Sequence, residues 1–219
     1  MACGPDVIFI GGWLAGSYDA LSQIAPVVYL ATDSDLGVVE SVRQNTRAIA
    51  SLFGLEDTAG ELMTGFDSRV AALASFSEGR TAIVWAWLPA AASMWCAPTG
   101  PRWTSNDGRC SLIGREAGFA NVGADAQPGT STHGNEASFE FLVDKDPDYL
   151  FVLDRDAAIG TDGAKLAQEV VENELMKGTA AYRDGRIVYL VHPAVWYTAE
   201  GGITALDRML RDLEDPLLK

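Results

Sequence analysis

Histidine and cysteine are scarce in this chain, which has two His and three Cys among its 219 residues. Cys3, Cys96 and Cys110 show no CxxC-type spacing, so they do not predict a structural zinc site. Cys96 and Cys110 flank a loop rich in Gly, Pro and Trp. For this pair two interpretations stay open: a disulfide if the protein is exported, or two buried free thiols.

The signatures of common enzyme active sites are also missing. The sequence contains no GxSxG, no HExxH, no Walker loop and no GxGxxG motif after a strand. His192 precedes Pro193 in a turn and is expected to be structural, and no family signature pairs a His with a Cys. We therefore expect a protein that is not an enzyme.

Basic residues are outnumbered, since 16 Lys and Arg face 30 Asp and Glu, for a formal net charge of -14. A nucleic-acid surface needs clustered Lys and Arg, so no nucleic-acid partner is expected. The longest apolar runs, residues 7–10 and 82–88, have the length of strands and do not predict a transmembrane segment. The residues before the first run do not have the pattern of a signal peptide, so none is expected there. Membrane contact is expected only through a partner protein or through a lipid anchor that the sequence does not show.

Strand and helix patterns alternate along the chain. Short apolar runs predict strands at residues 7–10, 27–30, 81–88, 149–153 and 187–190. Helical patterns lie between or beyond them, at residues 38–53, 62–73, 109–117, 138–145, 164–175 and 203–213. Asp33, Ser34 and Asp35 are expected to cap the first long helix, and Gly54 to end it. Strands separated by helices favour an α/β fold with parallel sheets.

One local pattern occurs twice. Residues 5–10, Pro-Asp-Val-Ile-Phe-Ile, resemble residues 147–152, Pro-Asp-Tyr-Leu-Phe-Val. Each is followed by a Gly-containing loop, a helical stretch and a matching strand, at 27–30 and 187–190. Right-handed crossovers would place both loops at the carboxyl edges of their sheets, where open α/β sheets bind ligands. Two such edges facing each other would form a cleft. The alternative is that Pro-Asp before a strand is only a common turn-to-strand signal.

His133 and Tyr197 each have a plain structural interpretation. His133 lies in the polar loop Ser131–Asn135 and could cap the helix that follows. Tyr197, between the last predicted strand and the last helix, could pack with Trp196 over a sheet edge. Together they suit Fe(III), a hard ion that favours anionic oxygen and accepts imidazole. A tetradentate bis-catecholate leaves two of the six coordination positions of the ion open, which one phenolate and one imidazole could fill.

Such a ferric complex is anionic and needs cationic neighbours. Arg109 begins a predicted helix, and Arg155 follows a predicted strand. The guanidinium group offers a fork of donors that suits catecholate oxygens and stays charged at any relevant pH. For Arg155 the alternative is a surface ion pair with Asp154 or Asp156.

At these residues the sequence resembles the class III periplasmic binding proteins of ABC importers, most closely the catecholate siderophore-binding type. The similarity extends over nearly the whole chain and is carried by residues 5–10, 18–26, 131–141, 146–155 and 196–202. It implies an α/β fold of two lobes joined by a helical backbone, with the ligand in the cleft between them. It further implies that His133 and Tyr197 are the iron ligands and that Arg109 and Arg155 line the pocket.

The resemblance also implies what the protein binds and where it works. It implies no enzymatic activity and no intrinsic cofactor, because Fe(III) is carried as a ferric catecholate siderophore complex. The implied partner is the permease of an ABC importer, and the implied location is the periplasm or the extracytoplasmic surface. Other interpretations stay open: a binding protein for haem, cobalamin or a hydroxamate siderophore, a metal-dependent enzyme on a two-lobed scaffold, or a truncated paralogue that binds poorly.

The chain departs from the family pattern at three places. Family members carry a further β/α segment before the strand that begins here at Val7, so an incomplete N-terminal lobe with an unpaired sheet edge is expected. The loop after this strand often holds an Arg in the family. Here it contains Trp13, which could stack on an aromatic ligand instead. The stretch from Trp95 to Gly108 is longer than in the family, so Arg109 corresponds less directly to its family counterpart than Arg155 does.

The expected organisation has four segments. Residues 1–33 form a partial N-terminal lobe and residues 34–80 the connecting helices. Residues 81–200 form the C-terminal lobe, and residues 201–219 a helix that returns to the N-terminal lobe.

Overall fold

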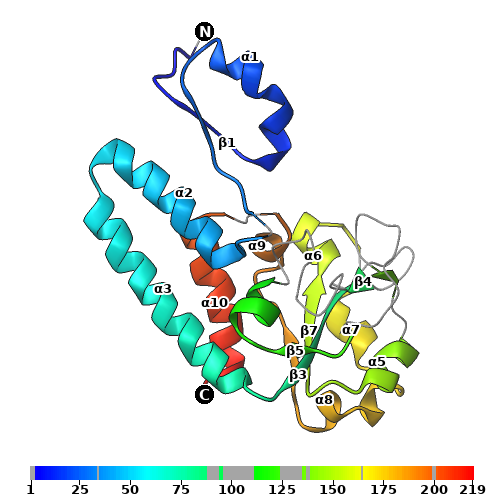
Figure 1. The fold of residues 1–219 in the computed structure, drawn as a ribbon. Coiled ribbons are helices and arrows are strands. Elements are labelled where there is room, and N and C mark those ends of the chain that lie inside the picture. The colour runs from blue at the N-terminus through cyan, green and yellow to red at the C-terminus, as the bar shows by residue number, and fades with distance from the viewer. Residues whose placement is uncertain are drawn as a thin grey trace.

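The structure, a computed structural model, describes residues 3–33, 35–87, 94–95, 111–123, 135–136, 139–163, 165–198 and 201–219. A small N-terminal unit stands at one end of a larger α/β body, and three long helices flank that body on one side (Figure 1). The architecture confirms the α/β fold expected from the alternation of strand and helix patterns. Within the described ranges, no helix has both the length and the apolar composition that crossing a bilayer requires.

The N-terminal unit is a single β-α-β element. Strands β1 (Ile8–Ile10) and β2 (Val27–Tyr29) pair in parallel, with Phe9 opposite Val28. A 3-10 helix, η1 (Gly12–Ser17), and the short helix α1 (Tyr18–Ser22) connect them. Because both strands run in the same direction, the loop after β1 and the segment after β2 leave the same edge of this sheet.

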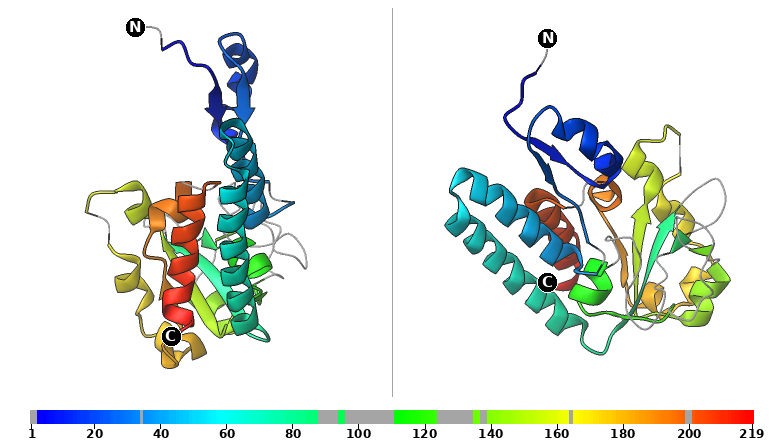
Figure 2. Two further views of the ribbon diagram at one scale, coloured as in Figure 1. Left: turned by 90° about the vertical axis from the view of Figure 1, so that its left-hand side faces the viewer. Right: turned by 45° about the horizontal axis from the view of Figure 1, so that its top comes forward.

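Helices α2 (Val38–Phe53) and α3 (Glu56–Ser77) form a hairpin, and α10 (Ile203–Leu217) packs against both of them (Figure 2). Gly54 ends α2 as predicted: its φ of 66° lies in the left-handed region, and its N–H donates to the Ala50 carbonyl. All three helices fall within the segments predicted for connecting helices and for the last helix. The segment boundaries themselves stay a prediction.

The predicted cap of α2 was wrong. Gly37, with a φ of 86°, is the N-cap residue, and as a glycine it has no side chain that could form a capping bond. Asp33 instead accepts the N–H of Asp35 at 2.8 Å, which makes a local turn before the helix. The Asp33 side chain, four residues before the N-cap, therefore orders the approach to α2 without capping it.

The main sheet has the strand order β6-β4-β3-β7-β8, and β5 pairs with β3 beyond this path. Strands β3, β5, β7 and β8 are mutually parallel where they pair, whereas β4 and β6 run antiparallel. Their bounds are β3 (Thr81–Trp87), β4 (Met94–Trp95), β5 (Ala120–Asn121), β6 (Asn135–Glu136), β7 (Tyr149–Asp154) and β8 (Ile187–Tyr189). The parallel pairs β1–β2 and β7–β8 confirm that the repeated sequence pattern builds two β-α-β elements.

Shorter helices complete the body. They are η2 (Leu112–Glu116), α5 (Phe139–Lys145), α6 (Arg155–Ile159), α7 (Ala167–Val171), η3 (Met176–Gly178), α8 (Ala180–Arg183) and α9 (Pro193–Thr198). The helix predicted over 164–175 is much shorter in the structure. It ends at Val171 because the Asn173 side chain accepts the N–H groups of Leu175 and Met176, at 3.0 and 3.1 Å, and so competes with helical hydrogen bonding.

Both faces of the main sheet are buried. Along β3, Ala82 and Val84 point into the core under α2, α3 and α10, while Ile83 and Trp85 point into the core under α5 and α7. Strand β7 alternates in the same way, with all residues from Tyr149 to Leu153 buried. A strand buried on both faces is typical of parallel sheets covered by helices. The body is therefore a three-layer α/β/α sandwich.

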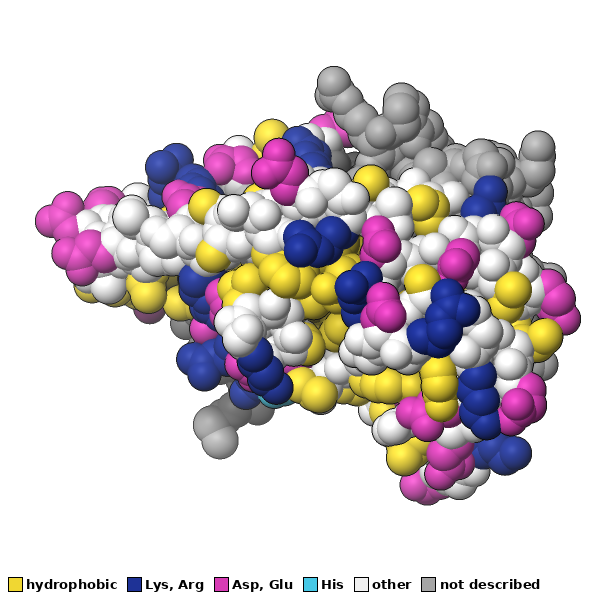
Figure 3. Space-filling view, turned by 90° about the horizontal axis from the view of Figure 1, so that it is seen from below, with side chains coloured by type: hydrophobic (Ala, Val, Ile, Leu, Met, Phe, Trp, Pro, Cys, Tyr) yellow, Lys and Arg dark blue, Asp and Glu magenta, His cyan; other side chains and the backbone are white. Residues whose placement is uncertain are grey.

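Ion pairs and mixed charges mark the outer surface of the helical layer. Arg69 of α3 binds Glu214 through two nitrogens, at 2.7 and 2.6 Å, and Asp207 at 2.7 Å, so it ties α3 to α10. On the face seen from below, Lys and Arg side chains are interspersed with Asp and Glu side chains (Figure 3). That face therefore presents no continuous basic surface.

Glu116, at the end of η2, joins the body to the start of α2. Its Oε1 accepts the N–H of Val39 at 3.0 Å, and a Cβ at Gly37 would collide with this carboxylate. Its Oε2 is buried and has no hydrogen-bond partner among the described residues. Burial raises the pKa of the Glu116 carboxyl above its ordinary range, and the bond from Val39 opposes that shift only in part.

The raised pKa predicts a pH-dependent contribution of Glu116 to stability. The contribution is greatest below about pH 4.3, the ordinary pKa of a glutamate, and is lost as the pH rises through the higher pKa of the folded state. Glu116→Gln removes this dependence. Between pH 4 and pH 7 the difference in free energy of unfolding, variant minus parent protein, should therefore increase. Urea unfolding at several pH values measures this difference.

Asp148 is the matched control for this experiment. Its pKa is lowered, first of all because its carboxylate accepts the backbone N–H of Thr81. The stability that Asp148 contributes is present above about pH 3.9 and is lost as the pH falls through the lower pKa of the folded state. Asp148→Asn should therefore lower the free energy of unfolding at neutral pH and change it little in acid. An identical pH profile for the two variants would contradict the assignment.

Candidate ligand site between the N-terminal unit and helix α9

Tyr197 lies in α9, a helix that the sequence patterns did not predict. Pro193 is its first residue, a position where the missing N–H of proline costs nothing, and the His192 carbonyl accepts the N–H of Val195 at 2.9 Å. Helix α9 packs against α6 and α10. The Tyr197 ring is partly buried against the main core, so its hydroxyl group is held at the surface of the body rather than on a loop.

Arg155 and Tyr197, which the sequence analysis selected separately, are in direct contact. The Arg155 Nε donates to the Tyr197 hydroxyl at 3.0 Å, and the guanidinium carbon lies 5.6 Å from the centre of the Tyr197 ring. Both a hydrogen bond and a cation–π contact therefore join the two side chains, which are 42 residues apart in sequence. This contact brings together two of the predicted site residues.

The carboxylates beside Arg155 leave this contact intact. Asp154 caps α6: its Oδ1 accepts the Ala157 N–H at 2.9 Å and its Oδ2 the Ala167 N–H at 2.8 Å. Asp156 Oδ1 is 3.8 Å from the Arg155 Nη1, a loose ion pair. Of the two carboxylates weighed as ion-pair partners for Arg155, the structure therefore pairs it with Asp156, whose side chain is buried, alongside the bond to Tyr197.

A cleft of about 480 Å³ lies between the N-terminal unit and the end of α9. It is lined by the loop after β1, the end of β2 with the segment that follows it, and the last residue of α9: Gly11, Gly12, Tyr29, Leu30, Ala31, Thr32 and Thr198. Thr198 directly follows Tyr197 in sequence, whereas Tyr197 and Arg155 themselves are not among the residues that line the cleft. The carboxyl edge of the β1–β2 sheet thus faces the C-terminal body across this cleft, as predicted for ligand binding in open α/β sheets.

The other predicted site residues are not tested. His133 and Arg109 lie outside the described residues, as do Cys96 and Cys110. The backbone of Trp13 belongs to η1 beside the cleft, while its side chain lies outside the described part. Among the described residues, no group of three or more His, Cys, Asp or Glu side chains is placed to hold a metal ion.

Tyr29 and Thr198 line the cleft but were missed by the sequence analysis. Tyr29 ends β2 and is 47% exposed. The position of Tyr29 at the carboxyl end of the second strand of the repeat was a usable signal, because both strands of a parallel pair end at one edge. Thr198 had no such signal, since α9 itself was not predicted.

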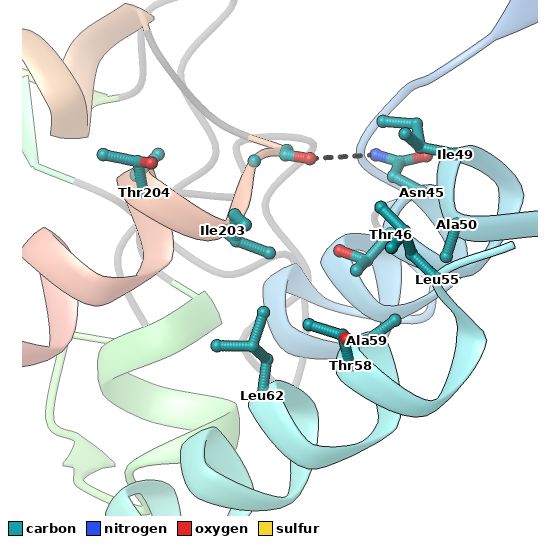
Figure 4. A pocket seen from close by; sticks show the side chains of 13 residues that line it. Asn45, Thr46, Ile49, Ala50, Leu55, Thr58, Ala59, Leu62, Ile203 and Thr204 are labelled. Carbon is teal, nitrogen blue, oxygen red and sulfur yellow. Dashed lines mark hydrogen bonds between the residues drawn. The ribbon is translucent and has the colours of Figure 1, made fainter. Parts of the chain in front are cut away.

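A second, apolar cavity of about 440 Å³ lies between α2, α3 and the start of α10 (Figure 4). Apolar side chains such as Ile49, Leu55 and Leu62 line it, and Asn45 donates across its edge to the Gly201 carbonyl at 3.2 Å. None of the described residues that line this cavity is charged, and the same holds for the lining of the cleft at the end of α9.

Two β-α-β elements, a layer of long helices beside the main sheet and a cleft at the carboxyl edge of the β1–β2 sheet define a two-lobed solute-binding protein. The chain belongs to the family described as periplasmic binding protein, whose model matches residues 1–194. The proteins of this family bind substrates and are not enzymes.

Similar proteins carry siderophore-related names. The chain is 29% identical over 222 residues to the petrobactin-binding protein YclQ of Bacillus subtilis, covering 98% of this chain and 64% of that protein. It is 24% identical to the ferric-anguibactin-binding protein FatB of Vibrio anguillarum, covering 97% of this chain and 63% of that protein. The chain therefore spans slightly under two thirds of the length of these curated relatives.

Solved structures show the same fold. The periplasmic catecholate-siderophore binding protein VctP of Vibrio cholerae superposes with a TM-score of 0.84 at 28% identity, covering 97% of this chain and 72% of that chain. The YclQ structure gives a TM-score of 0.83. These neighbours support the two-lobed class III fold expected from the sequence.

Proposed function

We propose that this chain binds a ferric catecholate siderophore in the cleft beside Arg155 and Tyr197. In this proposal it delivers the complex to the permease of an ABC importer, and it works in the periplasm or on the extracytoplasmic surface. The names of YclQ, FatB and VctP support a ferric siderophore as the cargo, and catecholate chemistry is the form named for VctP.

The contact between the Arg155 guanidinium and the Tyr197 hydroxyl is the observation that carries the proposal. A phenol oxygen held by a permanent cation at 3.0 Å is a fixed, oriented donor atom, and the next residue in the chain, Thr198, lines the cleft. Fe(III) favours anionic oxygen ligands, and the remaining N–H groups of Arg155 can serve the catecholate oxygens of the same complex. One pair of side chains would thus supply a metal ligand and a counter-charge.

In the proposed complex, the iron is cargo and the protein holds no resident cofactor. A tetradentate bis-catecholate fills four positions on Fe(III), and Tyr197 and His133 fill the other two. Arg155 and Arg109 neutralise the negative charge of the ligand. Trp13, in the loop after β1, stacks on a catechol ring from the opposite wall of the cleft.

The test is a titration of the intact chain with a synthetic ferric bis-catecholate, followed by intrinsic tryptophan fluorescence. The controls are the Ga(III) complex, haem and a hexadentate ferric hydroxamate. We expect tight binding of the Fe(III) and Ga(III) bis-catecholates, which share charge and coordination number. His133→Ala should weaken this binding about 10–100-fold, as the loss of groups at a metal site commonly does. Preferred binding of haem or of the hydroxamate, or indifference to His133→Ala, would contradict the proposal.

A further inference from the structure

Asp212 is a buried carboxylate on the apolar face of α10. Its side chain is fully buried, among the core residues Met209, Leu210 and Leu213. An ionisable group is costly at such a position unless donors surround it, and an apolar residue there often stabilises a fold equally well. Its presence therefore calls for an explanation in what it binds.

All the donors that Asp212 binds belong to the segment of α9. Its Oδ2 accepts the backbone N–H of His192 at 3.0 Å and the indole N–H of Trp196 at 2.8 Å, and its Oδ1 lies 2.6 Å from the His192 Nδ1. One carboxylate thus holds both the start and the middle of a six-residue helix. A helix this short has no stability of its own, so such contacts set its orientation.

The orientation of α9 decides where the Tyr197 hydroxyl lies. Successive helical residues are turned by about 100° around the axis. Trp196, only 1% exposed, points towards α10, and the next residue, Tyr197, is turned towards α6 and Arg155. Fixing the Trp196 indole on Asp212 therefore fixes the direction of the Tyr197 phenol, which meets Arg155.

We propose that Asp212 is a positioning residue of the ligand site, which sets the direction of the Tyr197 phenol beside Arg155 by holding His192 and Trp196. This inference rests on the proposed function, because it assigns Tyr197 the role of an iron ligand. The carboxylate touches neither the ligand nor Tyr197, and its effect is transmitted through the rotation of α9.

The first measurement needs no ligand. Tyrosines are labelled with 3-fluorotyrosine, and the ¹⁹F resonance of Tyr197 is identified by its absence in Tyr197→Phe. Asp212→Ala should displace this resonance. Asp212→Asn should leave it near its original position, because the amide oxygen can accept both N–H groups and the amide nitrogen can donate to the other tautomer of His192. Asp207→Ala is the matched control: Asp207 lies on the same helix but binds Arg69 and Arg211 rather than α9.

The second measurement compares two ferric complexes. Asp212→Ala should weaken binding of the tetradentate bis-catecholate about 10–100-fold, the usual effect of losing an outer partner of a metal ligand. A hexadentate tris-catecholate needs no protein ligand, so its affinity should change less than about threefold, as should both affinities in Asp212→Asn and Asp207→Ala. Unchanged binding and an unchanged ¹⁹F signal in Asp212→Ala would overturn the inference. Equal losses for both complexes, or equal losses in Asp207→Ala, would also overturn it.

Two further outcomes are decisive. If the parent protein binds neither complex, the proposed function fails, and the ¹⁹F resonance alone then decides whether Asp212 positions Tyr197. If Asp212→Ala does not fold, Trp196→Phe takes its place, since it keeps an aromatic ring but loses the indole N–H. A displaced Tyr197 resonance in Trp196→Phe supports the inference, and an unchanged one overturns it.

Discussion

Tyr197→Phe is expected to raise the dissociation constant for a ferric bis-catecholate about 100-fold, which corresponds to roughly 2.7 kcal/mol. The phenyl ring keeps its packing against the core, so the fold should be retained. The variant loses the oxygen that the proposed coordination requires, and the Arg155 Nε loses its acceptor at 3.0 Å. The measurement is a fluorescence titration, together with the visible phenolate-to-iron absorption band, which should disappear.

The control for this variant is Tyr18→Phe. Tyr18 lies in α1 of the N-terminal unit, away from α9 and its contact with Arg155, and is 44% exposed. The affinity of Tyr18→Phe for the ferric bis-catecholate should match that of the parent protein. The hexadentate tris-catecholate supplies a second control, because Tyr197→Phe should bind it normally. Full affinity of Tyr197→Phe for the tetradentate complex, with the absorption band intact, would remove Tyr197 from the coordination sphere.

Phe151→Ala is expected to lower the free energy of unfolding by about 3–5 kcal/mol, the usual cost of such a cavity in a packed core. Phe151 is fully buried in the middle of β7, and its ring centre is 5.2 Å from that of Phe119. Strands β3 and β8 flank it on both sides, opposite Val84 and Val188, so the backbone cannot move inwards to fill the space. Urea unfolding followed by circular dichroism measures the loss.

Phe53→Ala is the matched control for the core. Phe53 ends α2 and is 61% exposed, so its loss should change the free energy of unfolding by less than about 0.5 kcal/mol. Phe151→Leu, which keeps much of the volume, should fall between the two. Similar losses for Phe53→Ala and Phe151→Ala would show that β7 is not the centre of the core.

Much of the fold could be predicted because it is encoded over a few neighbouring residues. Residues 82–87 of β3 and 149–153 of β7 are continuously apolar, and strands of that kind are buried on both faces. Gly54 ended α2 where a left-handed residue was expected. The repeated Pro-Asp pattern identified both β-α-β elements, since each repeat contains its own strand, crossover and partner strand.

The site was only partly predictable. Arg155 and Tyr197 were selected for their chemistry and from the family resemblance, and the structure puts them in contact. The predicted roles of His133, Arg109 and Trp13 stay predictions. Tyr29 and Thr198 were missed because a cleft wall is built from segments far apart in sequence, whose meeting no local pattern records.

The sequence by itself determined strands β1, β2, β3, β7 and β8, where the first connecting helix ends, and which side chains could serve iron chemistry; it did not reveal the two-residue strands β4, β5 and β6. Periodicity and turn preference act between neighbours, so they can be inferred without coordinates. Only the tertiary structure decided that α9 exists, that Asp212 holds it through His192 and Trp196, and that Arg155 reaches Tyr197. Those contacts join residues 16 to 42 positions apart. They depend on how the crossovers fold back on the sheet, because a six-residue helix takes its orientation from what it packs against.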